Sequence, residues 1–428
     1  MIAILFGSFV PMLLLGVPIA LCLLLMTIFV YIDIGDPLLF LQIPQRMFTS
    51  TENLLLLAIP FFIMAGEIMN RAKITDKLMI LSGALVGWIR GGLAHTNIIA
   101  SMFFAGITGS AVSDTVAVGG IMIPAMKENG YDEDYSAAVT ASSSVIGPII
   151  PPSIPMLLYA SVMNVSIAGL FLGGLLPGIM VALFLMGTAY LVAVRKGIGE
   201  RAPFVGFVNL FIAFLRGIPA LLLPAIIMGG ILGGFFSPTQ ASAVAVMYGL
   251  VIGFIFYRTL SWSDIAPILK HTVTATAMIM FLLACAKSFS WLVSYYNLVE
   301  HVTLAFVTLT ENKYVFLLLV NILFLVLGMF LDMGFAIIVL GPLIAPIAYQ
   351  YGVDPIHFGL ITCVNLTIGL ATPPFGLVLF AACGVSGVKL APLSRAILPF
   401  IAAEIAVLLL ITYVPFFTMY FPRLFGFA

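Results

Sequence analysis

Oxygen-bearing side chains gather beside two Pro-Pro pairs in this sequence. Near the first pair lie Ser110, Ser113, Thr115, Ser142, Ser143, Ser144 and Ser153. Near the second pair lie Asp332, Asn365, Thr367 and Thr372. Hydroxyl, amide and carboxylate oxygens are hard donors of the kind that alkali cations prefer. The clusters therefore predict cation binding. The alternative is that Ser and Thr in membrane helices bond to their own backbone or let helices pack closely.

Two carboxylates, Asp114 and Asp332, accompany strongly apolar stretches. An ionisable residue inside a membrane segment is a functional candidate by default. The alternative is that each caps a helix at a hairpin tip on the aqueous boundary, which is a common role of Asp. Glu67, Arg90 and Lys287 could be intramembrane partners or snorkelling side chains, whose charged ends reach that boundary, and we favour snorkelling.

A spacing of 222 residues repeats through the chain and falls on residues that begin or end helices. The first set is Gly106, Pro124, Gly130, Asp132, Gly147, Pro151 and Pro152. Its copies are Gly328, Pro346, Gly352, Asp354, Gly369, Pro373 and Pro374. A fixed spacing of this kind indicates duplicated architecture. In membrane proteins, paired segments interrupted by Gly and Pro point to a transport site.

Each copy contains the signals for a turn, a new helix and a break in that helix. Gly130 and Gly352 can end one helix in the left-handed conformation, and Asp132 and Asp354 can cap the next. At the Pro-Pro pairs, missing amide hydrogens and ring clashes must open the backbone. Unpaired peptide groups are costly in hydrocarbon, so such breaks survive only where they are buried in protein or border an aqueous cavity. The two breaks therefore predict a polar site.

The composition requires a membrane. The 428 residues are 63% hydrophobic and 8% charged, whereas soluble proteins average about 25% charged residues. We predict an all-α polytopic membrane protein with about eleven or twelve crossings and two interrupted segments. The formal net charge is zero and no basic run occurs, so nucleic acid is not an expected partner.

Enzyme functions find little support, because the sequence has no nucleotide-binding loop, no H-E-x-x-H and no G-x-S-x-G motif. An intramembrane hydrolase using Ser110 or Ser113 with His95 would leave the second copy without a role. A passive channel is a further alternative, which would need a lined pore rather than two closed cation pockets. No cofactor is expected, and the four histidines share no metal-ligand spacing.

Several runs of sequence resemble one family. They are "FAGITGSAVSDTVAVGGIMIPAM", "GYDEDYSAAVTASSSVIGPIIPPSIPMLLYA" and "GLATPPFG". These runs look like the large membrane subunit of tripartite ATP-independent periplasmic (TRAP) transporters, and the resemblance covers essentially the whole chain. It implies two inverted repeats, each with scaffold helices, a re-entrant helical hairpin and a broken helix. The first would span residues 1–216, with a hairpin at about 102–126 and a connecting interfacial helix. The second would span 217–428, with a hairpin at about 328–348.

The resemblance also implies a mechanism. Transport would be secondary and driven by a Na⁺ gradient, with part of the fold sliding as an elevator against a static scaffold. The chain would be a multi-pass protein of the bacterial inner membrane. Its partners would be a small four-helix membrane subunit, the lipid bilayer and a soluble periplasmic binding protein that delivers an organic acid. The sequence most resembles sialic-acid members, and C4-dicarboxylate is the next choice.

Na⁺ sites of the family lie between a hairpin tip and a helix break, which carries over to particular residues here. In the first half these are Gly106, Ser110, Asp114, Ser142, Gly147 and Pro148. In the second half they are Gly328, Asp332, Gly369, Thr372 and Pro373. The substrate would lie between the two, with Ser110, Ser153 and Asp332 as its expected ligands. The second break carries Leu370 where the first has Pro148, so the two cation sites need not be equivalent.

Overall fold

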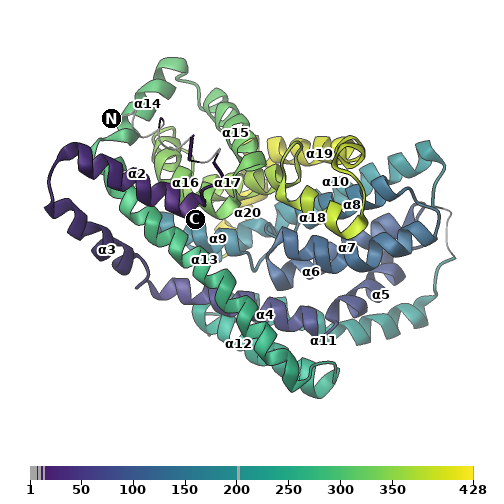
Figure 1. The fold of residues 1–428 in the computed structure, drawn as a ribbon. Helices are drawn as coiled ribbons and strands as arrows, with labels where there is room; N and C mark the ends of the chain where they lie inside the picture. The colour runs from purple at the N-terminus through teal and green to yellow at the C-terminus, as the bar shows by residue number, and fades with distance from the viewer. Residues whose placement is uncertain (1–6, 8–10, 13–14, 200–202, 428) are drawn as a thin grey trace.

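The computed structural model describes residues 7, 11–12, 15–199 and 203–427, and in this part of the chain it contains helices and no strands (Figure 1). The first half holds α2 (Ile19–Ile34), α3 (Leu38–Ser50), the 3-10 turn η1 (Leu54–Leu57), α4 (Ala58–Arg71), α5 (Ile74–Val86), α6 (Gly92–Thr108), α7 (Ala111–Glu128), α8 (Glu133–Ser144), α9 (Ile154–Met163), α10 (Ile167–Lys196) and α11 (Phe207–Leu232). The second half holds α12 (Pro238–Val251), the π-helical turn η2 (Ile252–Phe256), α13 (Trp262–Tyr295), α14 (Leu298–Leu309), α15 (Lys313–Phe330), α16 (Met333–Gln350), α17 (Pro355–Ala371), α18 (Leu377–Ser386), α19 (Leu390–Tyr413) and α20 (Phe416–Leu424).

Eight of the described helices are long and apolar enough to cross a membrane, and six further apolar helices have 10–17 residues. The breaks divide two of the predicted crossings into shorter helices. One consists of α8, residues 145–153 and α9. The other consists of α17, residues 372–376 and α18. The duplicated breaks predicted from the Pro-Pro pairs are therefore present.

The turns before the broken helices follow the predicted chemistry with one exception. Gly130 and Gly352 have φ of 79° and 70°, in the left-handed region. Asp354 caps α17, since its Oδ1 accepts hydrogen bonds from the backbone N–H groups of Ile356 and His357. The matching prediction for Asp132 is wrong: its side chain makes no capping bond to α8. Its Oδ2 instead pairs with Lys196 Nζ at 2.7 Å, because the end of α10 lies within reach.

Both hairpins form, but with longer arms than predicted. The first joins α6 to α7 through Gly109-Ser110, and the second joins α15 to α16 through Leu331-Asp332. The predicted bounds of about 102–126 and 328–348 contain both turns. Each first arm nevertheless begins earlier, at Gly92 and at Lys313, because nothing in these apolar runs stops a helix.

The segment that connects the two halves also differs from the prediction. We expected an interfacial helix followed by a separate crossing, with the repeats meeting at residues 216 and 217. The structure instead has one continuous helix, α11, across that position. Its two internal prolines, Pro219 and Pro224, leave it unbroken.

The described helices pack as two groups (Figure 1). In the outer group, α13 contacts α2, α3 and α4, α12 contacts α4, and α11 contacts α12 and α5. In the inner group, both broken helices pack with their hairpins and with α10, α19 and α20. The most extensive contact between the groups is that of α5 with α6, and α13 with α16 and α4 with α6 also pack together. The hairpin tips therefore lie close to the outer helices α4 and α13.

Candidate functional site

The tip of the first hairpin lies directly against the first break. Gly109 has φ of 59°, and a Cβ added to it would lie 2.5 Å from the carbonyl oxygen of Pro152. A Cβ added to Gly147 would lie 3.3 Å from the carbonyl carbon of Ser110. Both glycines thus permit backbone to meet backbone. Gly106 also lies close to this break, because a Cβ added to it would be 3.5 Å from the Pro151 carbonyl oxygen.

The first break is held by local hydrogen bonds rather than by a continuous helix. After Ser144 the chain continues with short-range bonds, such as that from the Gly147 N–H to the Ser144 carbonyl at 3.0 Å. Ser153 is fully buried. Its hydroxyl donates to the carbonyl oxygen of Pro148 and accepts from the Met156 N–H at 3.3 Å. Ser153, expected as a substrate ligand, is thus placed inside the break as the cap of α9.

Buried hydroxyls join the hairpin to α8. Ser101 and Ser143 share a hydrogen bond of 3.0 Å, and Thr115 and Ser144 share one of 2.6 Å. Ser142, expected at a Na⁺ site, donates to the carbonyl oxygens of its own helix at 2.9 and 3.1 Å. Its hydroxyl therefore follows the back-bonding alternative, which leaves its oxygen lone pairs available.

Asp114 lies in the first turn of α7 and is fully buried. Neither of its carboxylate oxygens has a hydrogen-bond partner among the described residues. Ser110, not Asp114, caps α7, by accepting from the Ser113 N–H at 3.4 Å. The capping alternative is thus wrong for Asp114. A buried carboxylate without a partner is costly, and a bound cation would supply the missing interaction.

The second hairpin meets the second break through two glycines. A Cβ added to Gly369 would lie 2.7 Å from Gly328 Cα. Asp332 caps α16, since its Oδ1 accepts from the N–H groups of Gly334 at 2.9 Å and Phe335 at 3.4 Å. The capping alternative therefore holds for Asp332. Thr372 bonds to the Ile368 carbonyl at 2.8 Å, and Pro373 beside it is half-buried.

One cavity of about 260 Å³ borders both hairpin tips and both breaks. Ser110 and Asp332 line it from the tips, and Pro148 and Leu370 line it from the breaks. The first turns of four helices also face it, with Ala111, Val112, Ser113, Ile154, Pro155, Met333, Gly334 and Leu377. The prediction that the two breaks enclose a shared polar site agrees with this geometry. Ser153, Asp114 and Thr372 are not among the residues that line the cavity.

Three lining residues were missed or discounted in the sequence. Glu67 and Asn70 come from α4, and His271 comes from α13. Glu67 was interpreted as a snorkelling side chain, whereas its carboxylate is 15% exposed and salt-bridged to Arg71 Nε at 2.8 Å. No local signal could pair α4 with α13, because their contact depends on the packing of helices far apart in sequence.

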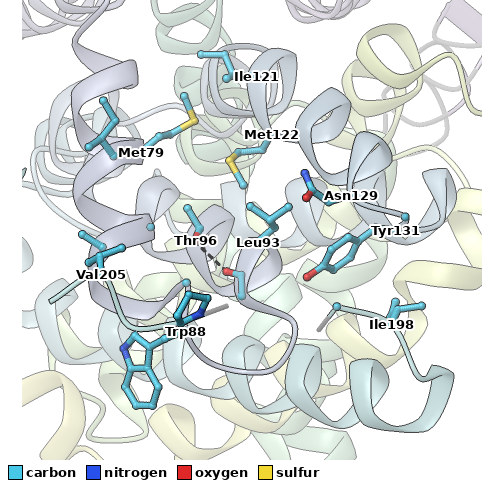
Figure 2. Close-up of a pocket in the computed structure, with 18 of the residues that line it drawn as sticks. Met79, Trp88, Leu93, Thr96, Ile121, Met122, Asn129, Tyr131, Ile198 and Val205 are labelled. Atoms are coloured by element: carbon cyan, nitrogen blue, oxygen red, sulfur yellow. Dashed lines mark hydrogen bonds between the residues drawn. The ribbon is translucent and has the colours of Figure 1, made fainter. Parts of the chain in front are cut away.

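A larger cavity, of about 900 Å³, lies at the other end of the first hairpin, between α5, α6, α7 and the segment after α10 (Figure 2). Met79, Trp88, Leu93, Met122 and Tyr131 line it. None of the predicted site residues does. A cavity of about 520 Å³ occupies the equivalent place between α14 and the end of α16. α5 still packs against α6 and α14 against α16 beside these spaces, and neither space contains the predicted site.

The hydrolase alternative does not fit the geometry. His95 lies near the start of α6, about 20 Å along the helix from the tip that carries Ser110. The ring Nε2 of His95 contacts the Arg90 carbonyl at 3.2 Å. Base and nucleophile are therefore not within reach of each other.

A membrane protein that is helical throughout its described part, and in which two broken helices and two hairpin tips border one cavity, has the architecture of a secondary transporter. The family comparison agrees: a model described as "Tripartite ATP-independent periplasmic transporter, DctM component" matches residues 6–417. The chain belongs to this family of large TRAP permeases, and the predicted resemblance is confirmed. Its relatives are transporter permeases and not enzymes.

Relatives with different cargoes resemble the chain to similar degrees. The sialic acid TRAP transporter large permease SiaM of Vibrio cholerae is 38% identical over 384 residues, covering 89% of each chain. The C4-dicarboxylate large permease DctM of the same organism is 34% identical over 444 residues, covering 99% of this chain and 98% of that protein. The YdaH transporter of Alcanivorax borkumensis shares the fold, with a TM-score of 0.61 and 16% identity over 88% of this chain and 87% of that one.

Proposed function

We propose that this protein is the membrane-spanning carrier of a Na⁺-coupled importer of an organic acid, located in the bacterial inner membrane. The observation that carries the proposal is the cavity shared by the two hairpin tips and the two breaks. The first turns of α7, α9, α16 and α18 line this cavity. Helix N-termini carry a positive dipole end, so four of them together favour an anionic cargo.

The hairpin–break contacts supply the oxygen donors that Na⁺ needs. At the first contact these are the Asp114 carboxylate, the Ser110 oxygens and the opened backbone at Gly147 and Pro148. At the second they are the Asp332 carboxylate and the backbone around Gly369 and Thr372. Na⁺ at these positions would neutralise the acidic groups beside an anionic cargo, which couples the binding of the two.

The inner and outer helix groups fit an elevator mechanism. Both hairpins and both broken helices belong to the inner group. Cavities of about 900 and 520 Å³ lie beside the hairpins, next to α5 and α14, although α5 packs closely against α6. Movement of the inner group as one body would therefore exchange the α5–α6 contact for another. A small four-helix membrane subunit would enlarge the outer group, and a periplasmic binding protein would deliver sialic acid or, as second choice, a C4-dicarboxylate.

Reconstitution tests this proposal. The complete transporter, with its small membrane subunit and its binding protein, should accumulate the acid in proteoliposomes when Na⁺ is high outside, and should do so without ATP. Replacing Na⁺ by K⁺ should abolish accumulation. Uptake that does not depend on Na⁺ would contradict the proposal. A flux of the acid that does not saturate and needs no binding protein would indicate a passive channel.

A further inference from the structure

The part of the 260 Å³ cavity that α4 and α13 line carries an acid. Residues Ile63, Gly66, Glu67 and Asn70 share one face of α4, and His271, Ala275 and Ile279 share one face of α13. Both helices belong to the outer group. The cavity thus has one wall of helix N-termini, which also carries the Asp332 carboxylate that the proposed Na⁺ would neutralise, and one wall with a second carboxylate, an amide and an imidazole.

Only part of the Glu67 carboxylate is used within the protein. Its Oε1 accepts from Arg71 Nε at 2.8 Å. Its Oε2 lies 3.6 Å from His271 Nδ1, beyond hydrogen-bond distance. Arg71, which also approaches Asp264 at 3.9 Å, does not line the cavity. The charge that the cavity meets on this wall is therefore the carboxylate, with one oxygen open to an incoming donor.

The two walls together restrict the cargo. A carboxylate on the cargo is favoured at the helix N-termini and disfavoured next to Glu67, because like charges repel at the short distances of a small cavity. Hydroxyl or amide N–H groups can instead donate to Glu67 Oε2, and Asn70 can both donate and accept. A volume of about 260 Å³ lies just below the roughly 300–1,000 Å³ of sites for drug-sized ligands, so the cargo is small.

We propose that Glu67 is a specificity-determining residue, which selects monocarboxylates with a hydroxylated far end over dicarboxylates. This inference rests on the proposed function, since it assumes that the cavity holds the cargo. It narrows the expected cargo from organic acids in general to sugar acids and similar compounds. It also means that a residue of the outer group of helices selects the cargo.

Competition binding to the purified membrane complex tests the inference without the binding protein, which has its own selectivity. Labelled N-acetylneuraminate is bound in Na⁺ and displaced by gluconate or by succinate. Wild type should prefer gluconate to succinate by about tenfold. Glu67→Gln keeps the shape and an acceptor for Arg71 while removing the charge, so it should bring the two competitors within about twofold.

Glu311→Gln is the matched control, because it removes the same charge at an exposed position away from the cavity. It should leave the preference unchanged. The Na⁺ concentration that stabilises Glu67→Gln against heat should equal that of wild type, which reports an intact fold. Equal displacement by succinate and gluconate in wild type would overturn the inference, as would an unchanged preference in Glu67→Gln. If either result is found while both kinds of acid still bind in a Na⁺-dependent way, the inference about Glu67 fails and the proposed function stands. Absence of Na⁺-dependent binding of any acid would overturn both.

Discussion

The two hairpin–break units come from one duplicated pattern, yet they differ in how far the backbone opens. In the first unit α8 ends at Ser144 and α9 begins at Ile154. In the second unit α17 continues to Ala371, and α18 begins at Leu377. Pro148 removes a donor and obstructs the helix in the first unit, whereas Leu370 at the matching place lets the helix continue. A single residue type thus changes how far the regular helix extends toward the cavity.

The acidic groups are also placed differently. The second tip carries Asp332 where the first carries Ser110. The first unit instead holds its acid one turn further on, at Asp114, where the second has Ala336. Asp332 faces the shared cavity and Asp114 is buried behind it. We infer that the second site senses cargo and cation together, while the first holds its cation away from the cargo.

The largest effect is expected at the second tip. Asp332→Asn retains a side chain that can cap α16 but removes the negative charge beside the cavity, so uptake should fall by about a hundredfold while the complex still assembles. Initial uptake rates and gel filtration of the complex measure this. Asp354→Asn is the matched control, since Asp354 caps α17 with the same pattern outside the cavity. Equal losses in the two variants would show that only capping matters.

A smaller effect is expected at the buried acid of the first unit. Asp114→Asn should raise the Na⁺ concentration for half-maximal uptake by about tenfold, because the neutral amide lacks the negative charge that offsets the charge of a bound Na⁺. Its effect on the apparent affinity for cargo should be slight, since Asp114 does not line the cavity. A Na⁺ titration of uptake separates these quantities. An unchanged Na⁺ dependence would remove Asp114 from the proposed site.

Exchanging the residue that distinguishes the two breaks should have a moderate effect. Pro148→Leu lets α8 extend toward the length of α17, which takes carbonyl groups into helical hydrogen bonds. We expect the Na⁺ requirement to rise by about threefold, less than in Asp114→Asn, because the carboxylate remains. The same Na⁺ titration measures it. A lower Na⁺ requirement than in wild type would contradict the role given to the opened backbone.

The smallest effect is expected for Ser110→Ala. It removes one neutral cap, worth about 1 kcal/mol, and one hydroxyl at the cavity. Uptake should fall by about fivefold with little loss of assembly. Ser166→Ala removes an equivalent cap from α10, with its 3.1 Å bond to the Gly169 N–H, away from the cavity. If Ser166→Ala lowers uptake equally, Ser110 has no role beyond capping.

The sequence predicted features that depend on local backbone chemistry. Gly130, Gly352 and the Pro-Pro pairs act on their immediate neighbours, so the turns and breaks were predictable from residue type. The shared cavity followed from the requirement that opened backbone be satisfied. The glycine contacts, such as Gly328 with Gly369, were expected as sites but not as the close backbone approach that they are.

Features that depend on distant packing were not predictable. Asp132 looked like a cap, but Lys196 from another helix pairs with it. Glu67 was interpreted as a snorkelling side chain, but His271 from α13 lies 3.6 Å from its Oε2. Glu404, in α19, is fully buried, and its carboxylate has no hydrogen-bond partner among the described residues. The sequence around Glu404 does not indicate that it is more deeply buried than Glu67. Such side chains acquire their roles from neighbours that single-sequence patterns do not identify.

The cavity is built from two bodies, since α4 and α13 supply one wall and the hairpin tips supply the other. If the inner helices slide during transport, a molecule held at the tips leaves Glu67 behind. Glu67 would then contact the cargo in only one conformation of the carrier, and the cargo would move with the inner helices without it. Selection of the cargo during binding and release of the cargo on the other side of the membrane would consequently depend on different residues. A mutation could therefore change one without the other.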